Sequence, residues 1–397
     1  MWQWGFLRRP WRHAFTDSLC YRLMKTAPIR FATVSHVGLS VLAPLYRARR
    51  GWDALRGSAP EMKRGRSLFY RTIWSDAATA LGATIVDLGD SLLEIRTESG
   101  TLRILEYYTS LDDLVTLRIA GNKPLVHRLL RERGLPVPSH CVCDFDDFKT
   151  ASQFVGGSHS SFVVKPARST AAGNGVTAGV RGARGLVRAM AFAGAYCGEV
   201  LIERQVEGDD YRLLYLDGEL LDAVKRLPPG VDGDGSSSVL RLIATENERR
   251  RKQGFEASQT FIKTDWELRQ TLKRQGLRLR SVPRAGEHVK LKSKINENNR
   301  AENKAATELV CASLVRAGSI AAATLGVRLA GVDVVTPDPL VPLEECGGAI
   351  IEVNTTPGLH FHYRSQGDSP PVARAILRHV IATSQPASHA TGFRIGA

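Results

Sequence analysis

Two strand-like stretches late in the chain carry polar side chains among apolar ones. Asp333 lies within LAGVDVV, and Glu352 and Asn354 occupy alternate positions of AIIEVN. Side chains two residues apart project from the same face of a strand, so Glu352 and Asn354 share a face. A carboxylate flanked by valines on a buried strand needs a partner to offset its desolvation. The fold must therefore place Asp333 beside a metal ion, or beside a cation in a salt bridge.

Asp333, Glu352 and Asn354 together are candidate magnesium ligands. Mg2+ favours carboxylate and amide oxygens combined with phosphate oxygens, and two carboxylates can bridge a pair of ions on a triphosphate. A lone strand acid would favour the salt bridge, but the neighbouring ExN pair favours the metal. These residues are therefore candidates to hold two Mg2+ ions on a triphosphate, and Mn2+ can substitute for Mg2+.

A second candidate element follows the stretch SFVVKP. Lys165 lies near its end, and the loop RSTAAGNGV behind it contains Gly173 and Gly175. Small residues let backbone N–H groups approach phosphate oxygens, while the lysine adds a positive charge. By itself, the pattern is more typical of an ordinary turn between strands.

Further charged residues lie downstream of this loop. In LIERQVEGDDYR, Glu203 lies on a strand, and Asp210 and Arg212 alternate after a hinge. These carboxylates can accept hydrogen bonds from a ribose or an adenine, or can be ordinary surface charge. Four more cations follow on later strands, namely Lys225, Arg226, Lys290 and Lys292. If they face one pocket they can neutralise a transferring phosphoryl group and an oxyanion, and the alternative is a solvated strand face.

The apolar pattern predicts an α/β or α+β chain of several lobes. Residues 67–118 are expected to form a helix and three strands, a small lobe. Residues 119–385 are expected to form two lobes that hold a ligand between them. Within them, the polar and Gly-rich residues 228–288 predict an insertion that covers a site, and an Ala-rich helix is expected over 303–325.

Most of the net charge of +14 lies at one end of the chain. Residues 1–66 hold 13 Lys and Arg against 3 Asp and Glu, and the other residues carry a net charge of only +4. This distribution argues against an extended nucleic-acid surface and suits a pocket for phosphates. Because Trp2, Trp4 and Trp11 alternate with arginines, residues 1–66 can attach to an anionic membrane or a protein partner. Alternatively they pack on the core or act as an organellar presequence.

The six cysteines include no CxxC pair and no histidine at zinc spacing. This argues against a disulfide framework and against a zinc site. No apolar run reaches the roughly 18 to 20 residues that a membrane span needs. We therefore expect a soluble protein of the reducing cytoplasm.

With these motifs in this order, residues 121–363 resemble the ATP-grasp superfamily, and within it the ATP-grasp half of cyanophycin synthetase. The motifs that carry the resemblance are GNKPLVHRLLRERGLPVP, VVKPARSTAAGNGV, LIERQVEGDDYR, AVKRLPPGVDGDG, LAGVDVV and IIEVNTTPGLHFHY. The resemblance implies an ATP-grasp fold, in which the lobe with Lys165 and the lobe with Asp333 and Glu352 clamp one ATP.

The resemblance also implies a role for each matching residue. It implies nucleotide contacts from Lys123, Lys165 and Glu203, a ribose contact from Glu207 or Asp210, metal ligands at Asp333, Glu352 and Asn354, and a phosphate and acyl-transfer region lined by Arg212, Arg226, Lys292 and Asn296. Two departures concern the substrate. The loop STAAGNG has fewer glycines than is usual in the family, and His360 follows PGL where an arginine is common.

The expected function is that of an ATP-dependent ligase, which joins a carboxylate to an amine through an acyl phosphate on an amino acid or peptide. Cyanophycin synthetase continues into a Mur-ligase-like half, and no GxxxxGK[ST] occurs here. One ligation and a product other than cyanophycin are therefore expected. The alternatives are a phosphotransferase with the same nucleotide site, and a degenerate ATP-binding scaffold attached to a membrane or partner. The sequence is compatible with a homodimer.

Overall fold

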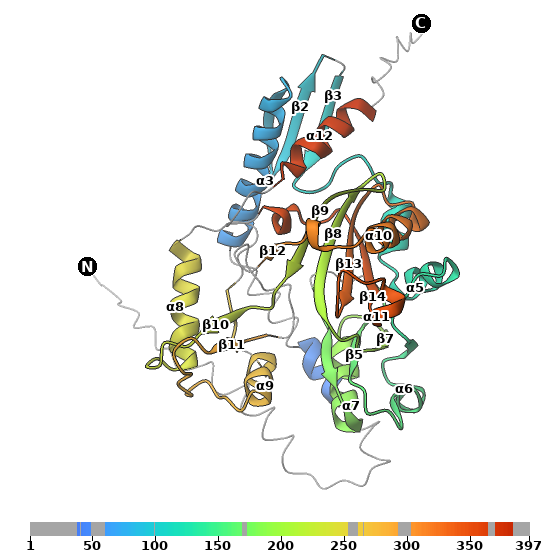
Figure 1. Ribbon diagram of the computed structural model, residues 1–397, viewed down its shortest axis with the longest axis vertical. Helices are drawn as coiled ribbons and strands as arrows, with labels where there is room; N and C mark the ends of the chain where they lie inside the picture. Colours follow the sequence, from blue (N-terminus) through green and yellow to red (C-terminus); the bar gives the residue numbers. More distant parts are fainter. Residues whose placement is uncertain are drawn as a thin grey trace, which may run out of the picture.

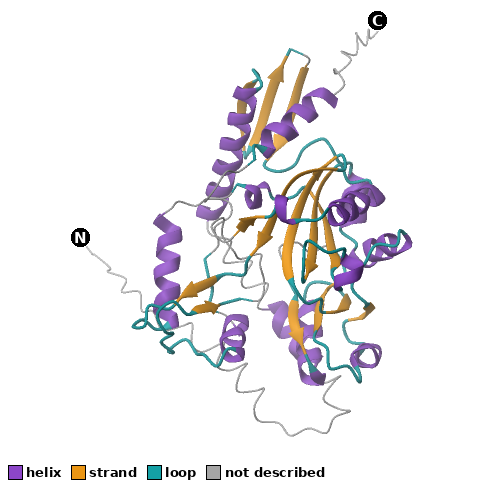
Figure 2. Cartoon of the chain, in the orientation of Figure 1, coloured by secondary structure: helices purple, strands orange, loops and turns teal. Residues whose placement is uncertain are grey.

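The computed structural model describes residues 38–39, 41–48, 60–98, 100–168, 173–252, 261–264, 266–292, 303–363 and 370–383. Within these residues the chain forms four sheets, and every strand pairing is antiparallel (Figure 2). The chain is therefore of the α+β class, and the α/β alternative is dropped. Three expected elements lie outside the described residues, namely the Trp-Arg segment at 1–37, the loop residues 169–172, and Asn296.

A small lobe combines residues 60–105 with the last described helix of the chain (Figure 1). Its elements are α3 (Pro60–Ala80), β1 (Thr84–Gly89), β2 (Leu92–Thr97), β3 (Gly100–Leu105) and α12 (Val372–Thr383). Tyr70 and Trp74, which lie on one face of α3, share a buried core with Ile95 and Ile376. The lobe expected at 67–118 thus begins at Pro60 in the structure. It also includes α12, which was expected to belong to the domain over residues 119–385.

A four-stranded sheet forms the lobe that contains Lys165. Its strand order is β4 (His140–Asp144), β7 (Glu199–Arg204), β5 (Phe162–Pro166) and β6 (Thr177–Val180), accompanied by α6 (Phe148–Val155) and α7 (Gly182–Gly194). Val164 and Ile202 are fully buried in its core together with Met190 of α7. These apolar strands hold Lys165 and Glu203 in fixed positions at the edge of the core.

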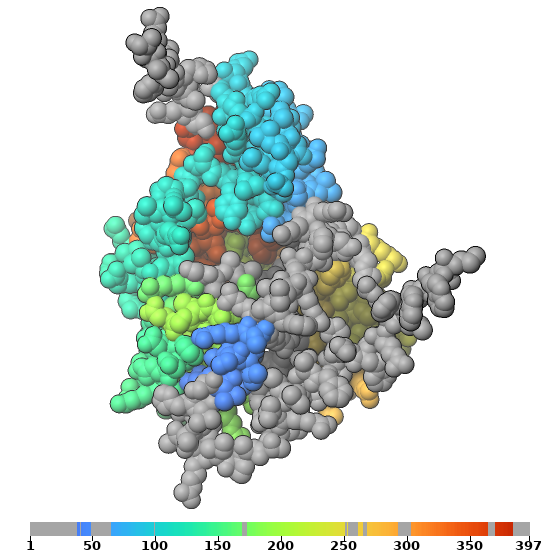
Figure 3. Space-filling view, turned by 180° about the vertical axis from the view of Figure 1, so that it is seen from behind, coloured from blue at the N-terminus to red at the C-terminus, as the bar shows by residue number. Residues whose placement is uncertain are grey.

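Part of the basic N-terminal segment packs onto this lobe. Residues 41–48 are helical, and Leu39 and Ala43 join the same buried core. Arg47 donates a hydrogen bond to the carbonyl of Gly194, at 3.3 Å. Figure 3 shows this helix in blue against the green lobe. Within the segment expected over 1–66, the described residues 38–39 and 41–48 thus pack on this lobe, and residues 1–37 lie outside the described residues.

A five-stranded sheet forms the second lobe. Its order is β12 (Asn303–Ala305), β9 (Glu219–Arg226), β8 (Asp209–Leu216), β13 (Leu329–Thr336) and β14 (Ala349–Thr355), with α4 (Leu114–Ala120), α5 (Lys123–Glu132) and α10 (Ala312–Leu325) beside it. Tyr211, Leu213 and Tyr215 of β8 lie in the apolar core with α10. Because side chains alternate along a strand, Asp210 and Arg212 lie on the opposite face.

The helix expected over 303–325 is shorter in the structure. Residues 303–305 form β12 and pair with β9, and η2 (Thr307–Leu309) precedes α10. Pairing with a sheet edge has overridden the local helix propensity of these residues. Within α10, Gly318 permits close packing, because a Cβ there would lie 2.2 Å from the hydroxyl of Tyr215.

The expected insertion is a subdomain with its own core. It contains β10 (Gly230–Asp232), α8 (Val239–Lys252), α9 (Trp266–Arg274) and β11 (His288–Lys290). Two short helices lie outside the insertion, namely α11 (Leu343–Cys346) and η3 (Leu359–His362). Val239 and Leu268 are fully buried in the subdomain. Arg274 of α9 reaches the carbonyl of Gly179 in β6, at 3.5 Å. None of the described helices is both long enough and apolar enough to span a bilayer.

We predict that α12 stabilises the whole small lobe. Ile376→Ala should lower the free energy of unfolding by about 2 to 5 kcal/mol, because Ile376 is fully buried and the substitution leaves a cavity. Arg374→Ala, at an exposed position of the same helix, should change it by less than about 0.5 kcal/mol. Urea denaturation of both variants measures this, and equal effects would contradict the packing of α12.

Candidate functional site

Charged side chains from four strands meet on the face of the five-stranded sheet opposite α10. Arg212 is paired across the strands with Asp333, and Asp333 with Glu352. Asp210 is paired with Arg226 on the next strand. Residues directly opposite on antiparallel strands project from the same face, so the register alone assembles this group.

Arg212 and Arg226 converge on Asp333, and all three side chains are buried. Arg212 forms a two-pronged ion pair with Asp333, in which Nη2 lies 2.9 Å from Oδ2. Arg226 Nη2 lies 3.2 Å from Asp333 Oδ1, and its Nε donates to Asp210 Oδ1 at 2.6 Å. Burial favours a raised pKa for Asp333, but the charges of Arg212 and Arg226 outweigh it and hold that pKa below its usual range. At Asp210 the effect of burial wins, and its pKa is raised.

Asn354 and Glu352 extend this group along β14. The amide of Asn354 donates to Asp333 Oδ2 at 3.2 Å and to the carbonyl of Gly331 at 3.3 Å. Glu352 Oε1 lies 3.6 Å from the ammonium of Lys123, which is buried at the start of α5. The three predicted metal ligands are therefore neighbours on one face of the sheet. The ammonium of Lys123, from α5, lies beside Glu352.

The donor set of these residues fits Mg2+. Among the described residues no group of three His, Cys, Asp or Glu forms a metal cluster. The candidate set is instead two carboxylates and an amide, which are hard oxygen donors. Asp333 accepts two donors at each oxygen, from Arg212 and Arg226 at Oδ1 and from Arg212 and Asn354 at Oδ2, so a metal ion at Asp333 would replace one of these donors. Glu352 is partly exposed and can turn toward an ion.

Lys165 and Glu203 form a second buried group on the other lobe, and His127 of α5 lies against it. Lys165 Nζ lies 2.8 Å from Glu203 Oε1, and His127 Nε2 lies 3.4 Å from the same oxygen. Within the described residues Oε1 accepts no hydrogen bond of good direction, although Lys165 is within ion-pair distance. The Glu203 carboxylate thus faces Lys165 and His127 through Oε1, and a carboxylate has further lone pairs with which it can accept a ligand donor.

His127 contacts both lobes through Nε2. This atom lies near Glu203 of the four-stranded sheet and 3.3 Å from the carbonyl of Ile351 in β14 of the five-stranded sheet. Burial, with the nearby charge of Lys165, lowers its pKa to about 3. The imidazole is therefore neutral, and the two oxygens around Nε2 favour a proton there. The sequence interpretation missed His127, although its spacing of four residues from Lys123 on one helix places both on the same face.

Of the remaining predicted site residues, some lie near these two charged groups or are buried, and others are exposed. Gly173 and Gly175 adopt left-handed φ values of 68° and 76°, and a Cβ on Gly175 would lie 2.6 Å from Pro166, next to Lys165. Lys292 is fully buried, whereas Glu207 is exposed. The proposed grouping of four strand cations is not observed: Lys225 pairs with Asp209 on the face opposite Arg226, and Lys290 is exposed.

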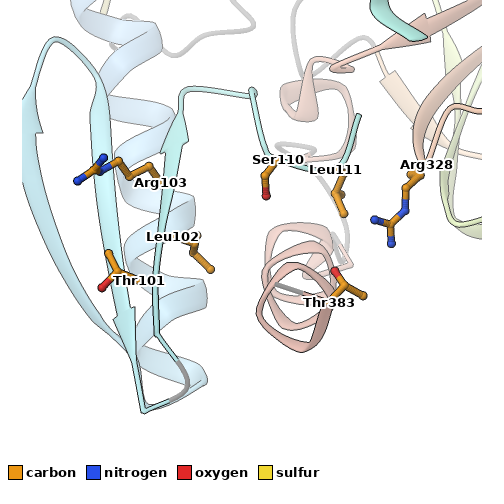
Figure 4. Close-up of a pocket in the computed structure, with 7 residues that line it drawn as sticks. All are labelled: Thr101, Leu102, Arg103, Ser110, Leu111, Arg328 and Thr383. Atoms are coloured by element: carbon orange, nitrogen blue, oxygen red, sulfur yellow. The ribbon is translucent and has the colours of Figure 1, made fainter. Parts of the chain in front are cut away.

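A separate cavity of about 640 Å3 lies between the small lobe and the start of β13 (Figure 4). Its lining includes Arg103, Arg328 and Thr383. Arg103 is paired with Glu94, and Arg328 with Asp217. None of the predicted site residues lines this cavity, so it is distinct from the charged face described above.

Comparison with known proteins gives relatives over most of this chain. No model of a protein family matches it. Cyanophycin synthetase from Nostoc sp. is 31% identical over 275 residues, which cover 68% of this chain and 30% of that protein. The glutathione biosynthesis bifunctional protein GshAB of Enterococcus faecalis is 31% identical over 268 residues, 65% of this chain and 35% of that protein. The chain thus spans about a third of the length of these relatives.

A solved structure shows that the fold is shared. The bifunctional glutathione synthetase of Pasteurella multocida matches with a TM-score of 0.53 at 23% identity, over 77% of this chain and 44% of that one. Two charged lobes of antiparallel sheet and the ordered motifs agree with this match. The chain belongs to the ATP-grasp superfamily. Within it, the chain is homologous to the ATP-grasp regions of cyanophycin synthetase and of the GshAB proteins, which confirms the expected resemblance.

We predict that His127 makes the fold sensitive to acid. The pKa of His127 falls from 6.5 to about 3 on folding, so below pH 6.5 the unfolded chain binds a proton that the folded chain does not. Stability from this residue is therefore lost as the pH falls from about 6.5 toward 3, by up to about 1.4 kcal/mol per pH unit. The stability gap between the wild type and His127→Gln should narrow from pH 7 to pH 4.5.

Urea unfolding at a series of pH values measures this gap. His159→Gln, which removes an exposed histidine, is the matched control and should leave the gap small at every pH. A gap for His127→Gln that stays constant with pH would contradict the neutral, buried state of His127.

Proposed function

We propose that this protein is an ATP-dependent carboxylate–amine ligase. The observation that carries the proposal is the meeting of two charged groups, Lys165 with Glu203 on one sheet and Arg212 with Asp333 on the other, joined through His127. The names of the relatives, a synthetase and a glutathione biosynthesis protein, support a bond-forming reaction. The acid and the amine are an amino acid or a peptide.

The nucleotide would lie between the two sheets. Lys165 and Lys123 are buried cations that can bind phosphate oxygens, and the turn at Gly173 and Gly175 packs against Pro166, next to Lys165. The buried carboxylate of Glu203, with its two oxygens, can accept from an N–H or O–H donor of the nucleoside as well as from Lys165. Asp210 is engaged by Arg226, so the exposed Glu207 is the freer candidate for the ribose.

Asp333, Glu352 and Asn354 would hold Mg2+ against the phosphates. The metal supplies charge neutralisation at the phosphate oxygens. The chain's own contribution is the orientation of these ligands, because Asp333 is fixed by two arginines and Asn354 is fixed to Asp333.

The proposed reaction has two steps. A substrate carboxylate oxygen bonds to the γ-phosphorus as the bond to ADP breaks, which gives an acyl phosphate. The amine nitrogen then bonds to the acyl carbon, loses a proton, and phosphate leaves. Arg212 and Arg226 present N–H groups near the charge that develops, which is the established way to stabilise such oxyanions. The insertion can exclude water from the acyl phosphate, with Arg274 as its contact to β6.

Product analysis tests the proposal against its alternatives. Pure protein is incubated with ATP, Mg2+ and pooled amino acids or short peptides, and free phosphate and new masses are followed. A ligase gives ADP, phosphate and a product lighter by one water than its two substrates combined. A phosphotransferase gives ADP and a phosphorylated product, and a scaffold gives no turnover. Either of the last two results rejects the ligase.

The metal assignment predicts that Glu352→Gln combined with Asn354→Ala abolishes ATP turnover and leaves the circular dichroism spectrum unchanged. Both residues lie on the polar face of β14, outside the apolar core. Glu344→Gln, at an exposed position nearby, is the control and should retain turnover. Wild-type turnover in the double variant would rule out these ligands.

Lys165→Ala should weaken ATP binding about tenfold to a hundredfold, because a charged hydrogen bond contributes about 1.5 to 3 kcal/mol. Lys149→Ala, which removes an exposed lysine of α6, should leave the affinity unchanged. Calorimetric titration measures both, with thermal unfolding in parallel because Glu203 loses its cation. Equal affinity in the two variants would refute the phosphate contact.

A further inference from the structure

One aromatic ring lies against both arginines of the candidate site. The Cζ atoms of Arg212 and Arg226 lie 5.2 Å and 5.5 Å from the centroid of the Phe361 ring. The two arginines come from adjacent strands, β8 and β9, and the ring comes from η3. A guanidinium within about 6 Å of a ring centroid is attracted by the electron-rich face of that ring. Phe361 is thus a shared partner of two side chains whose ion-pair partners among the described residues are the carboxylates of Asp210 and Asp333.

The small lobe fixes one side of η3. The backbone N–H of Leu359 donates to the hydroxyl of Tyr70 at 3.1 Å, and Leu359 is buried in the small-lobe core. Tyr363 accepts a hydrogen bond from the backbone N–H of Ala373 at 3.2 Å and packs edge-on against Phe69. Helices α3 and α12 therefore determine where this short helix lies.

The five-stranded sheet fixes the other side. The buried ring of His362 places Nδ1 2.7 Å from Asp222 Oδ2 on β9. The amide of Asn303 on β12 donates to the carbonyl of Phe361 at 3.3 Å. The ring is thus placed by contacts on both sides of η3, and none of these contacts involves Arg212 or Arg226.

The ring and the carboxylates act on different parts of each arginine. Asp210 and Asp333 bind N–H edges of the guanidinium groups, whereas an aromatic ring packs on a face. A carboxylate pair alone leaves a guanidinium free to rotate about the shared edge, and a ring on the face limits that rotation. The remaining N–H groups then point in a constant direction, as transition-state stabilisation requires.

We propose that Phe361 is a positioning residue, which holds the Arg212 and Arg226 guanidinium groups in a reactive orientation, and that the small lobe sets the ring through Tyr70. The proposal rests on the proposed ligase function. It also gives the small lobe a role in the reaction, although the lobe contributes none of the charged residues at the site.

The test compares Phe361→Leu, which removes the ring, with Phe361→Tyr, which keeps it. Phe361→Leu should lower kcat for ligation about tenfold or more, while the KM for ATP changes less than about threefold. Phe361→Tyr should stay within about threefold of the wild type in both. Tyr70→Phe, which removes the acceptor for Leu359, should lower kcat in the same direction. It should add little to Phe361→Leu, because both act on one ring.

A second measurement does not depend on activity. In protein with 15N-labelled arginine, the Nε–H signals of Arg212 and Arg226 should carry a ring-current shift that Phe361→Tyr preserves and Phe361→Leu removes. A wild-type protein with no ligation rejects the proposed function, and these signals still decide the positioning role. The proposal is overturned if Phe361→Leu keeps wild-type kcat, if Phe361→Tyr loses as much as Phe361→Leu, or if the signals do not respond to the ring.

Discussion

The buried charge cluster of Arg212, Arg226, Asp210 and Asp333 is the interaction on which the site depends. Its members come from three adjacent strands, and each charge has a partner on a neighbouring strand. Removal of one partner from such a cluster costs about 3 to 5 kcal/mol, because it leaves a buried charge uncompensated. A slip of one residue in any of these strands would also turn its charges into the apolar core. The same pairs therefore fix the strand register and the geometry of the site.

Local periodicity explains what the sequence could predict. The alternation of Glu352 with Asn354, and of Asp210 with Arg212, places each pair on one face, and the structure agrees. The same rule explains the grouping that the structure does not show. Lys225 immediately precedes Arg226, so the two must point to opposite faces, and Lys225 pairs with Asp209 instead. Adjacent strand cations cannot serve one pocket.

Contacts between distant segments are what the sequence could not predict. The choice between a metal and a salt bridge at Asp333 depended on register across β8, β9 and β13, which single-strand patterns do not contain. In the structure Asp333 has the salt bridge, and both of its oxygens already accept two donors, so a metal ion would have to replace one of them. In the same way, the apolar residues between 38 and 48 gave no local sign of the lobe on which they pack, and α12 gave no local sign that it packs on α3.

Charge balance links the two lobes to the proposed ligand. The charged pairs between the sheets comprise four cations and four carboxylates, namely Lys123, Lys165, Arg212 and Arg226 with Glu203, Glu352, Asp210 and Asp333. His127 is neutral, so it does not alter this balance. A polyphosphate that arrived alone would place several negative charges beside carboxylates that are already buried, at a large cost in this low-dielectric setting. Divalent cations that accompany the phosphates would offset that cost, and Glu352 and Asn354 lie where such ions could be bound. The pairing of these four cations with carboxylates is thus a physical reason for the proposed site to take a nucleotide as its metal complex.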